Sequence, residues 1–138
     1  MGGFTSFAGK FATFRIQMSS AQLLALDASP VLILPRPDPD QYISLLRVDM
    51  ALSAGDTQYV GGSDLMLVYG ETFTNGVITW PASILTGAVD SLALGLQNGT
   101  ADEPNFSAEP IFLALDGAAP TAGDGSITLY GSFVVFKA

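Results

Sequence analysis

Histidine and cysteine are both absent from the 138 residues of this chain. Without histidine, a Ser-His-Asp triad, an imidazole-ligated zinc site and imidazole acid–base catalysis are excluded. Without cysteine, disulfides, thiol nucleophiles and thiolate-bound metals are excluded as well. Most hydrolase mechanisms are therefore closed to this sequence, and we expect neither an enzyme activity nor a cofactor.

Charged residues are also scarce, at 13% of the chain against a hydrophobic share of 49%. Soluble domains usually carry about 25% charged residues. Either Ser, Thr, Asn and Gln cover the surface, or part of it is hidden against other subunits. We favour the second interpretation and expect a homo-oligomer. Five Lys and Arg against thirteen Asp and Glu give a net charge of −8, which disfavours binding to nucleic acid.

Long apolar runs are missing too. No run approaches the roughly 18 residues of a membrane span, and residues 1–10 lack the basic end and apolar block of a signal peptide. We expect a soluble, unprocessed chain that does not bind membranes. Residues 1–10, rich in Gly and small side chains, are predicted to form a flexible arm. Residues 11–138 are predicted to form one domain, because two separate cores would each be marginal in size.

What the chain does contain is alternation of apolar and polar residues, the period of a strand with one buried side. The alternation is clearest over residues 11–18 and 42–53, where Arg47 and Asp49 are expected to point to water or to a partner. The side chains expected to point inward in these two segments are Ala12, Phe14, Ile16 and Met18, and Leu46, Val48, Met50 and Leu52.

Counting such segments gives about eight strands, which predicts an all-β, single-domain β-sandwich or jelly roll. Asn75-Gly76 is a dipeptide typical of a tight hairpin turn. One or two short helical turns are expected, the first after the capping-box spacing of Ser19 and Gln22 and the second after Pro81.

The last strand, over residues 126–136, is apolar on both sides, which indicates either a central position between two layers or a subunit contact. Candidate interface residues are chosen from this strand, from the arm and from the aromatic side chains. They are Phe4, Phe7, Phe11, Trp80, Tyr130, Val134 and Phe136.

Acidic and aromatic residues leave two alternatives open. Two carboxyl groups at a defined separation suffice for a glycosidase, but most acids lie in predicted loops beside Pro or Gly, where turn formation explains them. Their spacing does not match a calcium loop, so no metal site is assigned. The aromatics could form a sugar-stacking platform, although packing is the commoner role. The loop acids are Asp38, Asp40, Asp56, Asp102, Glu103 and Asp124, and the aromatics are Tyr42, Tyr59, Tyr69, Trp80 and Phe106.

Five segments of the chain follow one another in a distinctive order. For comparison with known families, this order is more informative than any single segment. They are residues 18–26 (MSSAQLLAL), 30–35 (PVLILP), 59–70 (YVGGSDLMLVYG), 80–87 (WPASILTG) and 123–130 (GDGSITLY). In this succession the chain resembles small virion proteins of tailed bacteriophages, of the capsid decoration or cement type. The resemblance implies a jelly-roll-like trimer on the outer capsid surface, bound to the major capsid protein and made in the cytoplasm of the host bacterium. It implies no functional residues.

The leading hypothesis is therefore a structural virion protein that oligomerises and stabilises the capsid. The alternative is a head-fibre or tail module that recognises glycans on the receptor. An acid-pair glycosidase is the third and weakest hypothesis.

Overall fold

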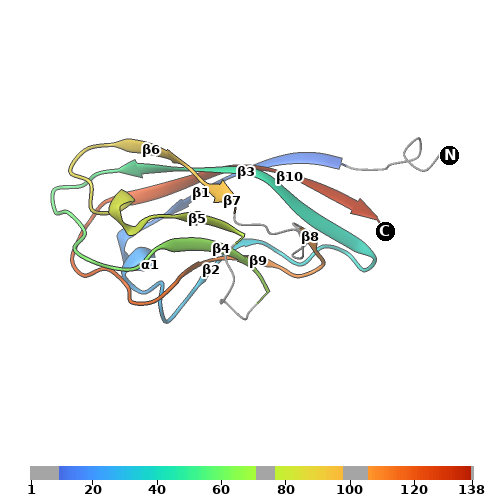
Figure 1. Ribbon diagram of the computed structural model, residues 1–138, viewed down its shortest axis with the longest axis horizontal. Helices are drawn as coiled ribbons and strands as arrows, with labels where there is room; N and C mark the ends of the chain where they lie inside the picture. The colour runs from blue at the N-terminus through green and yellow to red at the C-terminus, as the bar shows by residue number, and fades with distance from the viewer. Residues whose placement is uncertain (1–9, 71–76, 98–105, 138) are drawn as a thin grey trace.

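The computed structural model describes residues 10–70, 77–97 and 106–137, which form ten strands, one α-helix and one turn of 3-10 helix (Figure 1). The predicted Asn75-Gly76 hairpin turn and residues 1–9 of the predicted arm lie outside these ranges. The elements are β1 (Lys10–Met18), α1 (Ser20–Leu24), β2 (Val31–Leu34), β3 (Gln41–Ser53), β4 (Leu65–Tyr69), β5 (Ile78–Trp80), η1 (Ala82–Ile84), β6 (Ser91–Leu94), β7 (Leu96–Gln97), β8 (Phe106–Ser107), β9 (Ile111–Leu115) and β10 (Ser126–Lys137).

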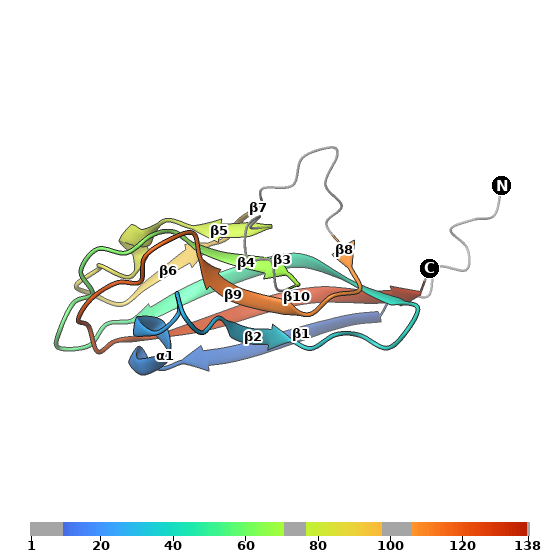
Figure 2. The same cartoon turned by 90° about the horizontal axis from the view of Figure 1, so that it is seen from below.

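The strands form two antiparallel sheets packed face to face, seen as two layers in Figure 1 and from the side of the second sheet in Figure 2. The first sheet has the order β1-β10-β3-β6, with β8 also paired to β3, and the second has the order β2-β9-β4-β5-β7. This arrangement confirms the predicted all-β sandwich.

The pairing of the eight longer strands is nested along the chain. β1 pairs with β10, β2 with β9, β3 with β6, and β4 with β5. A long antiparallel hairpin that folds over onto itself produces this order. The pairings of β10 with β3 and of β9 with β4 then join the strand pairs into the two sheets. The result is the double-sheet order of a jelly roll, in which residues far apart in sequence lie side by side.

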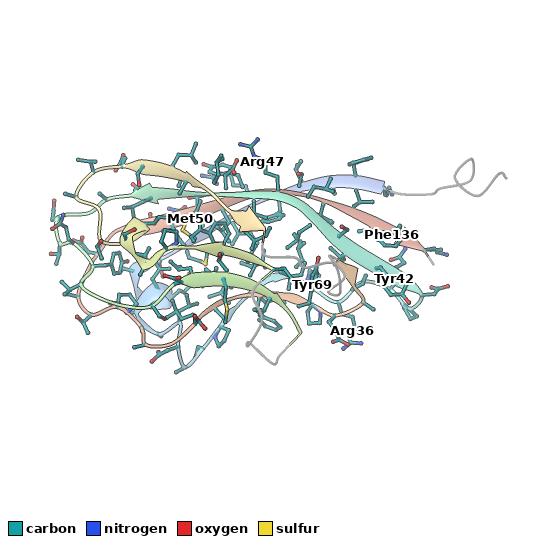
Figure 3. All side chains as sticks on the ribbon, viewed as in Figure 1. Arg36, Tyr42, Arg47, Met50, Tyr69 and Phe136 are labelled. Atoms are coloured by element: carbon teal, nitrogen blue, oxygen red, sulfur yellow. The ribbon has the colours of Figure 1, made fainter. Side chains whose placement is uncertain are left out.

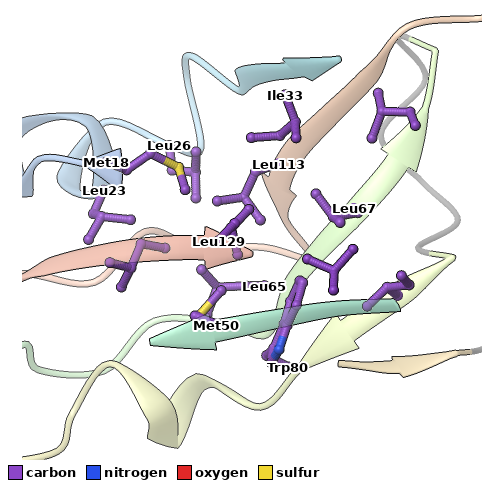
Figure 4. Packing of buried hydrophobic residues seen from close by; sticks show 14 of the residues in the cluster. Met18, Leu23, Leu26, Ile33, Met50, Leu65, Leu67, Trp80, Leu113 and Leu129 are labelled. Atoms are coloured by element: carbon purple, nitrogen blue, oxygen red, sulfur yellow. The ribbon is translucent and has the colours of Figure 1, made fainter. Parts of the chain in front are cut away.

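The core lies between the two sheets and is built from their inward side chains (Figure 4). Met18 at the end of β1, Leu129 on β10 and Leu113 on β9 are fully buried, as the alternating pattern requires. Trp80 is also fully buried, and its indole N–H donates to the carbonyl oxygen of Ala93 at 3.3 Å. Trp80 was predicted as an interface residue, and the structure corrects this: it is a core residue whose polar group is satisfied inside the chain.

Residue Leu46 corrects a second prediction, since it was expected to point inward. The register between β10 and β3 shifts at Ser132/Phe133, so that Ser132 faces Arg47 while Phe133 faces Leu45. Leu46 is the extra residue of this β-bulge. Its side chain is 42% exposed, and Leu45 takes the inward position at 3%. A bulge is set by pairing with the neighbouring strand, which the sequence of β3 alone does not reveal.

Both predicted helical turns are present. The hydroxyl of Ser19 accepts from the backbone N–H of Gln22, and the Gln22 side chain accepts from the backbone N–H of Ser19, which completes the capping box. The second turn follows Pro81, and Asp64 Oδ1 accepts from the backbone N–H of Ala82 at 3.1 Å. Both turns lie in connections between strands.

Candidate interaction surface

The first sheet turns an apolar side toward solvent. Inward residues of β1, β10, β3 and β6 belong to the core, so the residues between them point away from it. Among these, Phe11 is 75% exposed, Leu92 is 66% exposed and Leu94 is 59% exposed. Tyr130 is 43% exposed in the middle of β10. We call this side the outer face and define it by Phe11, Arg15, Arg47, Leu92, Leu94 and Tyr130.

Strand register places most of these side chains next to one another. Arg15 lies opposite Tyr130, Tyr130 opposite Asp49, and Asp49 opposite Leu94, which forms one row across the four strands. Leu92 is two residues from Leu94 and therefore lies on the same side, one row further along. The outer face is thus a patch that crosses the sheet rather than a set of scattered side chains.

The second sheet differs, because its outward residues on β4 and β9 are covered. Met66, Val68 and Ala114 alternate with core residues and so point away from the core, yet each is at most 3% exposed. Phe112 packs against this group. Leu92 and Leu94 on the outer face, by contrast, are each more than half exposed.

Two arginines lie among the apolar residues of the outer face. The guanidinium of Arg15 lies over the ring of Tyr130, 5.7 Å from its centroid. Nε of Arg47 donates to Oδ2 of Asp49 at 3.0 Å, with the Arg47 side chain 66% exposed. Figure 3 shows Arg47 extending from the first sheet away from the sandwich. An exposed ion pair of this kind adds little to stability, so both cations can contact a partner without a large loss to the fold.

Charge is strongly segregated between this sheet and the rest of the chain. The strands β1, β3, β6 and β10 contain four of the five basic residues of the chain. Of its thirteen acidic residues, only Asp49 lies on these strands. These strands therefore carry 4 − 1 = +3, and the remaining residues carry 1 − 12 = −11, which together give the net charge of −8. The four basic residues are Lys10, Arg15, Arg47 and Lys137. This sheet combines exposed apolar side chains with positive charge in an otherwise acidic protein.

The predicted interface residues fall into four groups: exposed, buried, half-buried and outside the described residues. Phe11 and Tyr130 lie on the outer face, while Phe4 and Phe7 are outside the described residues. Val134 is corrected: it lies on β10 on the same side as Tyr130, but it is only 6% exposed and offers little surface to a partner. Phe136 is half-buried and stacks on Tyr42, with ring centroids 5.8 Å apart.

The predicted sugar-stacking aromatics do not form one exposed platform. Besides Trp80, Tyr59 is buried at 3% exposure, and its hydroxyl donates to the carbonyl oxygen of Gly125. Burial raises the pKa of Tyr59, and the Asp124 carboxylate raises it further. The side chain of Phe106 lies outside what the structure describes.

Several carboxylates act as acceptors for loop backbone. Asp90 Oδ1 accepts from the N–H of Ala54 at 2.8 Å, and Asp124 Oδ1 accepts from the N–H of Thr57 at 2.9 Å. Within residues 10–70, 77–97 and 106–137, no three acidic side chains are grouped as a metal site would need. In the same ranges neither helical segment has the length and hydropathy required to cross a membrane.

Sequence reasoning missed Arg15, Leu92 and Leu94 as interface candidates. The leucines repeat at the strand period, which shows that they share one side but not that this side faces solvent. The concentration of basic residues on certain strands is a signal for this surface. It can be recognised only when it is known which strands share a sheet.

Comparison of the sequence with protein-family models and with curated proteins finds no match.

Proposed function

We propose that this protein is a structural virion protein of a tailed bacteriophage, which forms an oligomer, a trimer by the resemblance described above, and binds the outer capsid surface to stabilise it. It works without catalysis. Its partners are further copies of itself and the major capsid protein, and it reaches the virion after synthesis in the host cytoplasm.

The observation that supports this proposal is the outer face, where exposed Leu92, Leu94 and Phe11 lie on the same side of the sheet as Arg15 and Arg47. The strands β1, β10, β3 and β6 hold 38 residues, which at about 3.3 Å per residue and about 4.8 Å between strands give this side an area on the order of 600 Å². A stable protein–protein interface buries about 800 Å² on each partner. The sheet side therefore supplies most of the area that one partner buries in a stable contact, and adjoining loops would supply the rest.

A jelly roll suits such a role because its sheet sides and its loop ends are separate surfaces. One surface can hold neighbouring copies together while another contacts the capsid. The scarcity of charge noted in the sequence has the same explanation, since residues buried between subunits need no charge to remain in solution.

The test has two parts. The first is the mass of the purified protein by sedimentation equilibrium, which is expected to be a multiple of the 14.4 kDa chain. The second is co-sedimentation with mature heads of the phage that encodes it, with bovine serum albumin as the control protein. Heads that carry the protein should release DNA at a higher temperature than heads without it. A protein that stays monomeric and ignores heads would overturn the proposal.

A further inference from the structure

We infer that the outer face of one copy binds the acidic loop end of a second copy, so that the subunits associate face to end. This inference rests on the proposed function, because it names the two surfaces through which the oligomer would form. It commits to a second copy of this chain as the partner, and it follows from where the structure puts charge.

The acidic loop end is formed by the connections at the end of the sandwich where β3 finishes and β6 and β10 begin, on the left in Figure 1. The hydrogen bond from Ala54 N–H to Asp90 joins the loop after β3 to the loop before β6. The bond from Thr57 N–H to Asp124 joins it to the loop before β10. Asp56, between Ala54 and Thr57, adds a third exposed carboxylate. These two bonds keep the carboxylates of Asp90 and Asp124 next to the loop that carries Asp56.

Apolar contact is available at the same end. Val89 directly precedes Asp90 and is 71% exposed. A surface with carboxylates near an exposed valine complements one that carries arginines and exposed leucines on the same side of a sheet, because burying the apolar side chains brings opposite charges together. The loop end thus matches the outer face in both respects.

Charge also argues against the simplest alternative, in which two outer faces meet each other. That contact would bring Arg15 and Arg47 of both copies into one interface, with a single outward acidic residue, Asp49, from each copy. Like charges in one contact are unfavourable. A face-to-end contact instead places these arginines against the carboxylates of Asp56, Asp90 and Asp124.

The geometry has a consequence for the assembly. Because the outer face and the loop end are different surfaces of one molecule, their contact is heterologous, and repeating it produces a closed ring when the rotation between copies allows. A ring of three is the state that the proposed function expects. A contact between two identical surfaces would stop at a dimer.

Charge reversal tests the inference. The face variant is Arg15→Glu/Arg47→Glu, and the end variant is Asp56→Lys/Gln58→Lys, which leaves the apolar Val89 and the hydrogen-bonding carboxylates Asp90 and Asp124 in place. The control is Arg36→Glu/Lys137→Glu, which makes the same change in net charge as the face variant at exposed positions. Sedimentation equilibrium at low and high salt measures association, and circular dichroism checks that each variant is folded.

We expect the face and end variants each to associate at least about tenfold more weakly than the wild type at low salt, and the control to associate normally. Combining all four substitutions of the face and end variants in one chain should restore part of the association, because the two glutamates of the face then meet the two lysines of the end. Salt near 1 M, where the Debye length is about 3 Å, should reduce the differences.

Two results would overturn the inference alone: an oligomer that the face variant leaves intact, or a combined variant that stays as weak as its parents. In either case the proposed function survives if Leu92→Ser/Leu94→Ser still breaks the oligomer, since another partner surface would then cover the apolar residues. A wild type that is monomeric throughout would overturn both.

Discussion

Replacing Gly131 with alanine tests the packing directly beneath the outer face. Gly131 on β10 lies opposite Phe14 on β1, and a Cβ added at Gly131 would lie 2.2 Å from two carbons of the Phe14 ring. The ring therefore occupies the space that the missing side chain leaves, and it also contacts Phe133, with centroids 6.1 Å apart. An aromatic ring that covers a glycine on a neighbouring strand is a known way to stabilise a sheet.

The magnitude follows from two opposing effects. Inserting a methyl group into packed space costs about 1–3 kcal/mol, and replacing glycine within a strand recovers about 0.5–1 kcal/mol of backbone entropy. We expect Gly131→Ala to lower the free energy of unfolding by about 1–2 kcal/mol in the wild type. In a Phe14→Ala background the clash is gone, so the same substitution should be neutral or slightly stabilising. The coupling energy should be about 1–3 kcal/mol.

Urea denaturation followed by the fluorescence of Trp80, the single tryptophan, measures these free energies. Ile16→Ala is the matched control background, because Ile16 shares the strand and inward side of Phe14 but lies opposite Leu129. Gly131→Ala should keep its full cost there. If its cost is equal in the Phe14→Ala and Ile16→Ala backgrounds, the ring does not fill the space at Gly131 and the reasoning is refuted.

Three further substitutions test the fold by the same denaturation assay. Gly95→Ala should lower the free energy of unfolding by more than about 2 kcal/mol, because its Cβ would lie 2.6 Å from the backbone oxygen of Val48, which cannot move aside. A neutral result would contradict the close approach of Gly95, between β6 and β7, to the backbone of β3. Ser19→Ala should cost about 1 kcal/mol through loss of the helix cap, and a change below experimental error would refute the cap. Tyr59→Phe should cost about 1–2 kcal/mol at neutral pH, because a buried carbonyl loses its donor. Since burial raises the pKa of Tyr59 above 10.0, the free energy of unfolding should fall as the pH rises above 10.0. Tyr59→Phe should lose less stability over this pH range than the wild type, and equal losses would refute the raised pKa of Tyr59.

Local features were predictable from the sequence. The alternation of β1 gave the correct inward set from Ala12 to Met18, because each side chain's direction in a strand follows from its neighbours. The capping box at Ser19 was likewise readable, since its two partners lie three residues apart.

Features that depend on distant strands were not predictable. The exposure of Leu46 follows from a bulge against β10, and the burial of Trp80 follows from packing between the sheets. The outer face required the same information, because Arg15, Arg47 and Leu94 are far apart in sequence and come onto one side of the sheet only through pairing around β10 and β3. Chain topology, rather than residue pattern, decides such positions.

The contact role of the outer face is tested most directly by the mass of Leu92→Ser/Leu94→Ser compared with the wild type. Leu32→Ser is the control, since Leu32 is 50% exposed on β2 in the other sheet. Sedimentation equilibrium should give an oligomer for the wild type and for the control, and the mass of one 14.4 kDa chain for the outer-face variant. A wild type that sediments as a single chain at every concentration, or an outer-face variant that keeps the wild-type mass, would contradict the account.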